Sequence, residues 1–359
     1  MPQPRIAVTT GDPAGIGPEV CLQLLNEPAI RDIVEPIVFG DAFVLEKTAS
    51  ECGLKPPSHI VTNLDDAEGP CVLDLGIISP DEYETGIINA ATGRASYEYV
   101  TEAIYGALSG KVNAVTTGPI NKEALEMGSI PYPGHTEIFA DLTDSDRTCM
   151  LQYSNEIRCA FVTTHVGYAE VPALLTQKRI LEVIELCEEA MRSIRGKKPR
   201  LICCGLNPHA GENGLFGNGE EEQIIKPALE VARANGIDVT GPLPPDTAFL
   251  PQRRKDFDCV VCMYHDQGHI PLKALAFDNA VNTTLGLPII RSRTDPTAEL
   301  RHFFGEMKQP GRIIRTNHHS KINPAPKLGE HNELIEGLFY QDYPLKTEHH
   351  LDLSTLLKI

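Results

Sequence analysis

The chain has 359 residues, of which 42% are apolar and 23% are charged. This length and composition are typical of one large α/β unit or of two domains, and they exclude bulk disorder. The formal net charge is −17, from 32 basic and 49 acidic residues. A field of this sign repels polyanions, so general binding to nucleic acid or to anionic membranes is excluded. A few cations inside a cleft can still hold one small anion.

The sequence has no apolar run long enough to span a membrane and no visible export signal, so we expect a cytoplasmic protein. Most of the ten cysteines lie in apolar runs, where a reduced thiol behaves as a small hydrophobe. Cys259 and Cys262 form a C-x-x-C, but the run around them reads as a buried strand. Residues three apart in a strand point to opposite faces, so we expect no redox or zinc pair here.

Strands and helices alternate along most of the chain. In the first part, residues 5–10, 35–40, 71–76 and 112–118 are predicted strands, and residues 18–27, 41–52 and 91–110 are predicted helices. Further along, residues 148–153, 157–165, 199–207 and 257–265 are predicted strands, and residues 177–196 and 220–236 are predicted helices, the last ended by Gly236. This alternation predicts an α/β fold in which parallel or mixed sheets are covered by helices.

A glycine-rich segment, Gly11 to Glu19, follows the first predicted strand. Ligands of α/β proteins bind beyond the carboxyl ends of strands, and the amides at a helix start can hold an anion. The glycine spacing matches neither the dinucleotide-binding fingerprint nor a P-loop. An anion site and a purely structural turn therefore both remain open.

Three histidines close three separate predicted strands: His165, His209 and His265. If these strands are neighbours, the three imidazoles can meet at one point. Three neutral imidazoles suit a divalent transition metal that keeps an open coordination position, as in a catalytic site. No two of them form a local pair such as H-E-x-x-H, so three unrelated polar residues at strand ends are the alternative.

Two further clusters carry polar groups suited to an anionic substrate. His135 and Thr136 lie in a predicted turn and could donate to substrate oxygens, although Thr136 could instead cap a helix. Lys273 and Arg291 lie among apolar and turn residues rather than on a charged helix face. They could neutralise a phosphate or a carboxylate.

A series of motifs in a fixed order resembles the 4-hydroxythreonine-4-phosphate dehydrogenase family of pyridoxal phosphate biosynthesis. The motifs are T-T-G-D-P-A-G-I-G-P-E, T-G-P-I-N-K, G-H-T-E, N-P-H-A-G-E-N-G-L-F-G, P-D-T-A-F, Y-H-D-Q-G-H-I-P-L-K and V-N-T-T-L-G-L-P-I-I-R. The resemblance runs from about Arg5 to Asp295. It implies a two-domain α/β fold like that of the isocitrate and isopropylmalate dehydrogenases, and a homodimer whose active site lies at the subunit interface.

The resemblance also implies roles for individual residues and the groups that they bind. The implied metal ligands are His165, His209 and His265, for zinc, magnesium or cobalt. The implied substrate contacts are His135, Thr136, Lys273, Asn282 and Arg291, and the implied catalytic residues are Lys273 and Asp246. The implied cofactor is NAD or NADP, for which no binding residue is assigned.

The implied reaction is the metal-dependent oxidation of 4-phosphohydroxy-L-threonine. A base takes the hydroxyl proton, hydride passes to the nicotinamide, and the β-keto acid formed loses CO₂ to give 3-amino-2-oxopropyl phosphate. A sister dehydrogenase acting on D-threonate or D-erythronate 4-phosphate, or on an aromatic dihydrodiol, is an alternative. A metal-dependent hydrolase that uses the same histidines to activate water is another.

The chain departs from the family after Arg291. The family usually continues with T-S-x-D-H-G-T-A and a final helix, whereas here residues 291–298 read R-S-R-T-D-P-T-A and a polar, weakly patterned stretch follows. A metal-binding protein without catalytic activity is therefore a further alternative. The expected domains are residues 1–130 with 283–359, atypical from residue 296, and residues 131–282, which carry the metal site.

Overall fold

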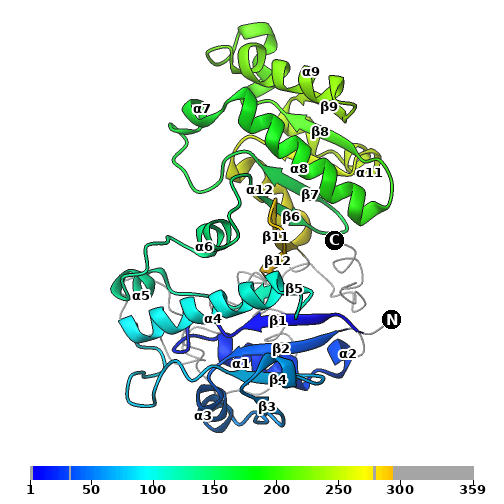
Figure 1. Cartoon of the computed structure of the whole chain (residues 1–359). Coiled ribbons are helices and arrows are strands. Elements are labelled where there is room, and N and C mark those ends of the chain that lie inside the picture. Colours follow the sequence, from blue (N-terminus) through cyan, green and yellow to red (C-terminus); the bar gives the residue numbers. More distant parts are fainter. Residues whose placement is uncertain (1–2, 32–33, 278–279, 294–359) are drawn as a thin grey trace, which may run out of the picture. The chain divides into compact units, whose positions relative to one another are not determined.

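The computed structural model describes residues 3–31, 34–277 and 280–293. It is a mixed α/β protein, which confirms the predicted fold class, and its chain divides into two compact units at Ile138 and Phe139 (Figure 1). The atypical tail lies outside the described residues. The structure places residues 283–293 in the second unit rather than in the first domain as predicted, and the predicted return of residues 294–359 to the first domain stays a prediction.

The first unit is built on a parallel sheet in the order β3-β4-β2-β1-β5. Its strands are β1 (Arg5–Thr9), β2 (Glu35–Gly40), β3 (Ile60–Val61), β4 (Cys71–Asp74) and β5 (Ala114–Thr117). Its helices are α1 (Gly17–Asn26), α2 (Pro28–Arg31), α3 (Ala42–Cys52), α4 (Ala90–Leu108) and α5 (Lys122–Met127), with a short turn η1 (Leu64–Asp66), and α6 (His135–Leu142) ends beyond the unit's boundary.

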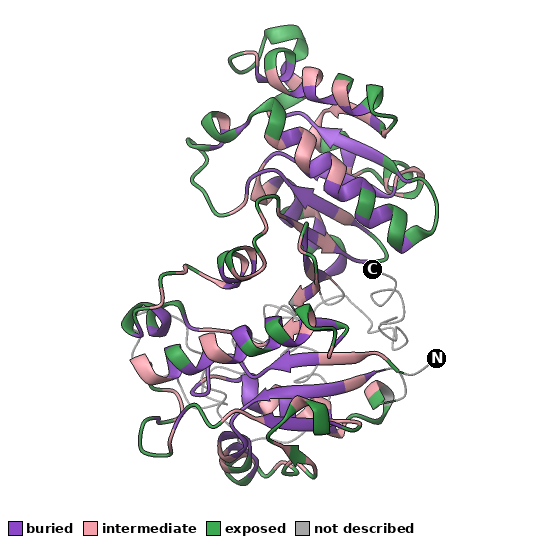
Figure 2. Cartoon of the chain, viewed as in Figure 1, coloured by how far each residue is buried: buried purple, intermediate pink, exposed green. Residues whose placement is uncertain are grey.

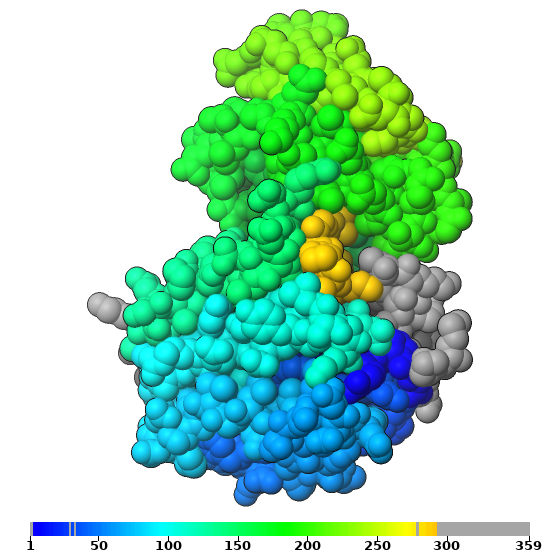
Figure 3. Space-filling view, in the orientation of Figure 1, coloured from blue at the N-terminus to red at the C-terminus, as the bar shows by residue number. Residues whose placement is uncertain are grey.

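Helices cover both faces of this first sheet. Val8 and Val38 pack with the apolar sides of α1 and α3. Phe39, the next residue along β2, points to the opposite face, where Gly106 of α4 approaches its ring. The strands are accordingly buried while the outer sides of the helices are exposed (Figure 2), and the cyan segment that holds α4 forms part of the surface (Figure 3).

The second unit is built on a mixed sheet in the order β12-β11-β6-β7-β10-β8-β9. Its strands are β6 (Cys149–Tyr153), β7 (Arg158–Phe161), β8 (Arg200–Cys204), β9 (Asp238–Leu243), β10 (Cys259–Cys262), β11 (Val281–Leu285) and β12 (Ile290–Arg293). Strands β7, β10, β8 and β9 are parallel, whereas β6, β11 and β12 pair antiparallel.

The helices of the second unit lie on both faces of its sheet. They are α7 (Val171–Leu174), α8 (Gln177–Arg195), α9 (Lys226–Ala234), α10 (Pro245–Ala248), α11 (Pro251–Asp256) and α12 (His265–Ala276), with short turns η2 (Pro208–Gly214) and η3 (Glu221–Ile225). Cys259 packs with the core under α8 and α9, and Cys262 packs with the opposite core that includes Leu272 of α12. The two cysteines thus face opposite sides of β10, as predicted.

Local sequence signals explain where these helices begin and end. Thr176 accepts a hydrogen bond from the backbone N–H of Arg179 at the start of α8, and Gly196 ends that helix with a φ of 64°. Gly236, just beyond α9, has a φ of 85°, which is the left-handed conformation expected of a helix-ending glycine. No helix in the described part of the chain is both long and apolar enough to cross a membrane.

Candidate active site

Three neighbouring parallel strands of the second unit carry the three singled-out histidines at their carboxyl ends. Strand β10 pairs with β7 on one side and with β8 on the other. His165 follows β7, His265 follows β10 and His209 follows β8. Because the strands are parallel, their carboxyl ends share one edge of the sheet, which is where α/β proteins bind ligands.

The structure brings two of these histidines together. The ring centroids of His165 and His265 are 5.7 Å apart. His265 is the first residue of α12, so the strand before it ends three residues earlier than predicted, at Cys262. Its Nδ1 lies 2.6 Å from a carboxylate oxygen of Asp266.

Asp266 has a second partner, because the hydroxyl of Tyr168 donates to its other carboxylate oxygen. The hydrogen bonds from Tyr168 and His265 hold the pKa of Asp266 below its usual value. The bond to Asp266 in turn raises the pKa of Tyr168. The carboxylate is therefore the ionised acceptor of both bonds.

His209 lies on its own loop, in an unusual backbone conformation. Residues 209–213 all have positive φ, between 40° and 77°, so the turn η2 is left-handed. The His209 side chain is 66% exposed, its Nδ1 lies 3.5 Å from a carboxylate oxygen of Glu212, and its ring lies 5.9 Å from that of Phe216. Such strain persists only where the surroundings impose it.

Buried carboxylates hold both ends of the loop that contains this turn. Glu221, which is 1% exposed, accepts hydrogen bonds from the backbone N–H groups of Leu206 and Asn207 at 2.9 and 2.7 Å. The side-chain amide of Asn207 donates to both Glu220 and Glu221. Glu220 also accepts from the backbone N–H of Asn218, so both ends of the loop are tied to the start of η3.

The donor types and the topology fit a divalent cation, since three imidazoles follow three adjacent strands and a carboxylate already orients one of them. Within the described residues, no group of three or more histidine, cysteine, aspartate or glutamate side chains lies close enough together to hold a metal ion. His209 is thus the predicted ligand that the structure does not bring to the pair.

A cavity of about 100 Å³ adjoins His265. It is lined by Gln152, His265, His269, Leu272, Lys273, Phe277 and Ala280. His265, His269 and Lys273 are spaced four residues apart on α12, so they share one side of the helix. The cavity therefore joins a predicted metal ligand to the predicted cationic contact, Lys273.

His269 lies between His265 and Lys273 on α12 and is a neutral imidazole. Its ring stacks on His265 at 3.8 Å and on Phe161 at 4.5 Å. Burial is the main cause that lowers its pKa to about 4. Its Nδ1 donates to the backbone oxygen of His265 at 3.0 Å, and its Nε2 accepts from the Gln152 amide at 3.2 Å.

Asn282 and Arg291 lie on the same face of the sheet as Gln152. Asn282 is paired with Gln152 across β11 and β6, and its buried Oδ1 has no hydrogen-bond partner among the described residues. Arg291 is 2% exposed, donates to the hydroxyl of Thr284 at 2.7 Å and lies over the ring of Phe139. Thr284 is two residues from Asn282, so their side chains point to the same face.

The remaining predicted site residues lie apart from these contacts. Asp246 is an exposed residue of α10 and is not among the residues that line the cavity. In the first unit, His135 is 4% exposed and begins α6. Thr136 lies within the first turn of that helix rather than ahead of it.

The glycine-rich segment of the first unit is held by close backbone packing. Gly11 has a φ of 71°, and a Cβ built there would lie 2.2 Å from the backbone oxygen of Pro119. The backbone N–H of Asp12 donates to that same oxygen at 2.9 Å, and its carboxylate accepts from the N–H of Ala14. Burial raises the pKa of Asp12. These contacts favour the structural turn over an anion site.

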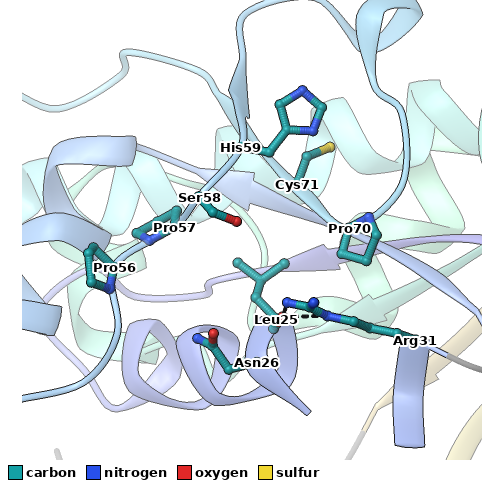
Figure 4. Close-up of a pocket in the computed structure, with 9 residues that line it drawn as sticks. All are labelled: Leu25, Asn26, Arg31, Pro56, Pro57, Ser58, His59, Pro70 and Cys71. Atoms are coloured by element: carbon teal, nitrogen blue, oxygen red, sulfur yellow. Dashed lines mark hydrogen bonds between the residues drawn. The ribbon is translucent and has the colours of Figure 1, made fainter. Parts of the chain in front are cut away.

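A second hollow lies at the amino ends of strands in the first unit, between Arg31, His59 and Cys71 (Figure 4). Its volume is about 10 Å³, which is about the room that one water molecule needs. Arg31 turns its guanidinium toward the backbone oxygen of Leu25 rather than into the hollow. It is not a substrate site.

Sequence reasoning missed three residues around the second unit's site. Gln152 lies inside a strand, where nothing in the pattern distinguishes it from other half-buried residues. Tyr168 lies in an irregular loop. Asp266 is adjacent to His265, and this adjacency was the one available signal that a carboxylate supports the imidazole.

Residues 32–297 match the family described as "Pyridoxal phosphate biosynthetic protein PdxA". The chain is 41% identical to a 4-hydroxythreonine-4-phosphate dehydrogenase of Desulforapulum autotrophicum, covering 82% of this chain and 87% of that protein. It is 40% identical to a D-threonate 4-phosphate dehydrogenase of Cupriavidus necator, covering 81% and 89%.

A solved structure gives the same result. The crystal structure of a 4-hydroxythreonine-4-phosphate dehydrogenase from Klebsiella pneumoniae matches with a TM-score of 0.76 and 40% identity, covering 82% of this chain and 90% of that one. The sequence motifs and the fold therefore point to the same group of dehydrogenases.

Proposed function

Because the chain belongs to the family of the pyridoxal phosphate biosynthetic protein PdxA and is an oxidoreductase, we propose that it oxidises 4-phosphohydroxy-L-threonine with NAD or NADP. The observation that carries this proposal is the shared edge of β7, β10 and β8. There an oriented imidazole pair adjoins a cavity bordered by Lys273.

His165, His209 and His265 would hold a divalent cation, which is zinc, magnesium or cobalt. When bound, the cation supplies Lewis acidity, which eases removal of the substrate hydroxyl proton. The chain's own contribution is to orient the imidazoles. Asp266 does this for His265 by accepting from its Nδ1, which leaves Nε2 as the basic nitrogen.

The anionic ends of the substrate would meet Lys273 and Arg291. Lys273 is an exposed ammonium at the cavity, whereas the guanidinium of Arg291 is buried and fixed by Thr284. Asn282 offers a buried amide oxygen to a substrate hydroxyl or ammonium group. His135 and Thr136 would add contacts, as the family resemblance implies.

Lys273 and Asp246 are the proposed catalytic residues, and a base beside the substrate would take the hydroxyl proton. The carbon that bears this hydroxyl would give its own hydrogen to the nicotinamide as a hydride, so that the alcohol becomes a ketone as the nucleotide is reduced. The resulting β-keto acid releases CO₂ and gives 3-amino-2-oxopropyl phosphate. We further propose a cytoplasmic homodimer in which the second subunit completes the active site.

A second candidate substrate is D-threonate 4-phosphate, together with its isomer D-erythronate 4-phosphate. It is favoured by the 40% identity to the Cupriavidus necator enzyme of that name. The two substrate types share the 4-phosphate and the carboxylate, and they differ at C2, which bears an ammonium group in one and a hydroxyl in the other. The proposed contacts with Lys273 and Arg291 suit either substrate, because both substrates carry these two anionic groups.

The test is an anaerobic, metal-supplemented assay of the full chain with each substrate and each nicotinamide cofactor. We expect absorbance at 340 nm to rise with at least one substrate, and only when a divalent metal is present. Comparison of kcat/KM between substrates assigns the physiological one. Release of phosphate without nucleotide reduction would instead identify a hydrolase and reject the proposal.

A further inference from the structure

Tyr168 is an exposed side chain with well-defined partners. It is 67% exposed, yet its hydroxyl donates to Asp266 and its ring packs edge-on against Tyr264, with centroids 5.8 Å apart. Both partners belong to the segment that leads from β10 into α12. The loop after β7 is therefore fastened to the start of α12 by this one residue.

The same loop is fastened at its other end. The backbone N–H of Thr163 donates to the backbone oxygen of Met263 at 3.2 Å, and the Thr163 hydroxyl donates to that oxygen at 2.8 Å. His165 lies between Thr163 and Tyr168. Two attachment points thus hold the loop against residues 263–266, and His165 is the histidine that they enclose.

Asp266 connects this attachment to the second imidazole. One of its oxygens accepts from Tyr168 and the other lies 2.6 Å from Nδ1 of His265. A carboxylate can only accept hydrogen bonds, so Nδ1 carries a proton, and in the neutral ring Nε2 is then the nitrogen with the lone pair. The ring of His269 stacks on one face of the His265 ring and restrains it.

We propose that Tyr168 and Asp266 are positioning residues, which fix His265 as its Nδ1–H tautomer and hold the His165 loop beside it. Both imidazoles are then presented together before a cation arrives. The consequence for metal affinity rests on the proposed function. The tautomer and the loop position do not, because they are properties of the chain without metal.

The first experiment reads the tautomer directly, on the full chain without metal. Long-range ¹⁵N–¹H NMR spectra distinguish imidazoles protonated at Nδ1 from those protonated at Nε2. We expect the His265 signals, assigned by their loss in His265→Ala, to report Nδ1–H. In Asp266→Asn the amide has one acceptor oxygen instead of two, so the fraction of Nε2–H should rise. An Nε2–H tautomer in the unaltered chain, or no change in the variant, would overturn the proposal.

The second experiment measures the affinity for Zn²⁺ by titration calorimetry. We expect affinity to fall about 10- to 100-fold in Asp266→Asn. In Tyr168→Phe, which removes one hydrogen bond from an exposed ring, it should fall about fivefold. Asp81→Asn and Tyr105→Phe replace an exposed aspartate and an exposed tyrosine of the first unit, and they should bind as the unaltered chain does.

The outcomes separate the two claims. If the unaltered chain binds no Zn²⁺ but shows the expected tautomer shift, the proposed metal-dependent function fails and the positioning role stands. If it binds Zn²⁺ and both site variants bind equally well, the positioning role is overturned and the function stands. Thermal unfolding of Tyr168→Phe should match that of the unaltered chain, which excludes a general loss of folding.

Discussion

The carboxyl ends of the parallel strands are built differently in the two units. In the first unit they are filled with backbone: a Cβ on Gly17 would lie 1.7 Å from the backbone oxygen of Thr10, and one on Gly118 would lie 2.5 Å from that of Thr9. In the second unit they carry side chains, including His209, which is 66% exposed. The same sheet architecture thus supports close packing in one unit and chemistry in the other.

The residue types at the strand ends therefore indicate which edge is packed and which is open to a ligand. Glycine marks the places where two loops approach too closely for a side chain. Histidine, lysine and arginine mark the places where side chains are held open toward a ligand. Changes at the first edge should mainly reduce stability, and changes at the second should mainly reduce activity.

The largest effect is expected for His209→Ala. Loss of one of three proposed metal ligands should lower kcat/KM at least about 1000-fold, whereas removal of an exposed side chain should change the free energy of unfolding by less than about 1 kcal/mol. Metal-supplemented kinetics and urea unfolding measure the two quantities. Normal turnover without added metal would contradict the ligand assignment.

The next effect is expected for Gly17→Ala in the first unit. The new Cβ would collide with a backbone oxygen that cannot move without disrupting β1, so the free energy of unfolding should fall by about 3 kcal/mol or more. Gly134→Ala is the matched control, because its Cβ would meet only the ends of flexible side chains, the Glu137 carboxylate at 3.6 Å and Cε of Lys122 at 4.0 Å. It should cost about 1 kcal/mol at most. An equal loss of unfolding free energy in both variants would contradict the close backbone packing at Gly17.

A smaller effect is expected for Arg291→Lys. Lysine keeps the charge but not the planar fork that bonds Thr284 and can hold an anion at the same time, so KM should rise about 10- to 100-fold. Arg195→Lys, which alters a partly exposed ion pair with Asp258, should leave KM unchanged. An unchanged KM in Arg291→Lys would remove this residue from the substrate site.

The smallest effect concerns the loop that carries His209. Burial opposes ionisation of Glu220, but hydrogen bonds from Asn207 and Asn218 outweigh it and lower its pKa. A lowered folded-state pKa gives stability that is present above the ordinary carboxyl pKa and is lost as the pH falls through the folded-state value. Glu220→Gln should therefore cost about 1 kcal/mol at pH 7 and less near pH 3, as urea unfolding at each pH would show. A cost that is independent of pH would contradict the ionised role.

The sequence predicted most of the strands and long helices, because their apolar periodicity is clear. It did not predict β9, whose Gly241 and Pro242 are unusual inside a strand, nor β11 and β12. The alternation of β7, β10 and β8 with helices was sufficient to place three histidines at one edge.

The finer structure of the site could not be predicted. The composition of residues 207–219 indicates a loop, but its ends are held by Glu220 and Glu221, which lie at the start of the following element. The pairing of Gln152 with Asn282 depends on the register of two strands that are far apart in the sequence. Long-range contacts of this kind leave no local pattern.

The central claim is that His165, His209 and His265 bind one divalent cation. X-ray absorption at the zinc edge of the Zn²⁺-loaded full chain tests it most directly, because imidazole ligands give a distinctive scattering pattern. We expect three imidazole nitrogens at about 2.0–2.1 Å from the metal. A first coordination sphere made of cysteine sulfur, or of oxygen with no imidazole, would contradict it.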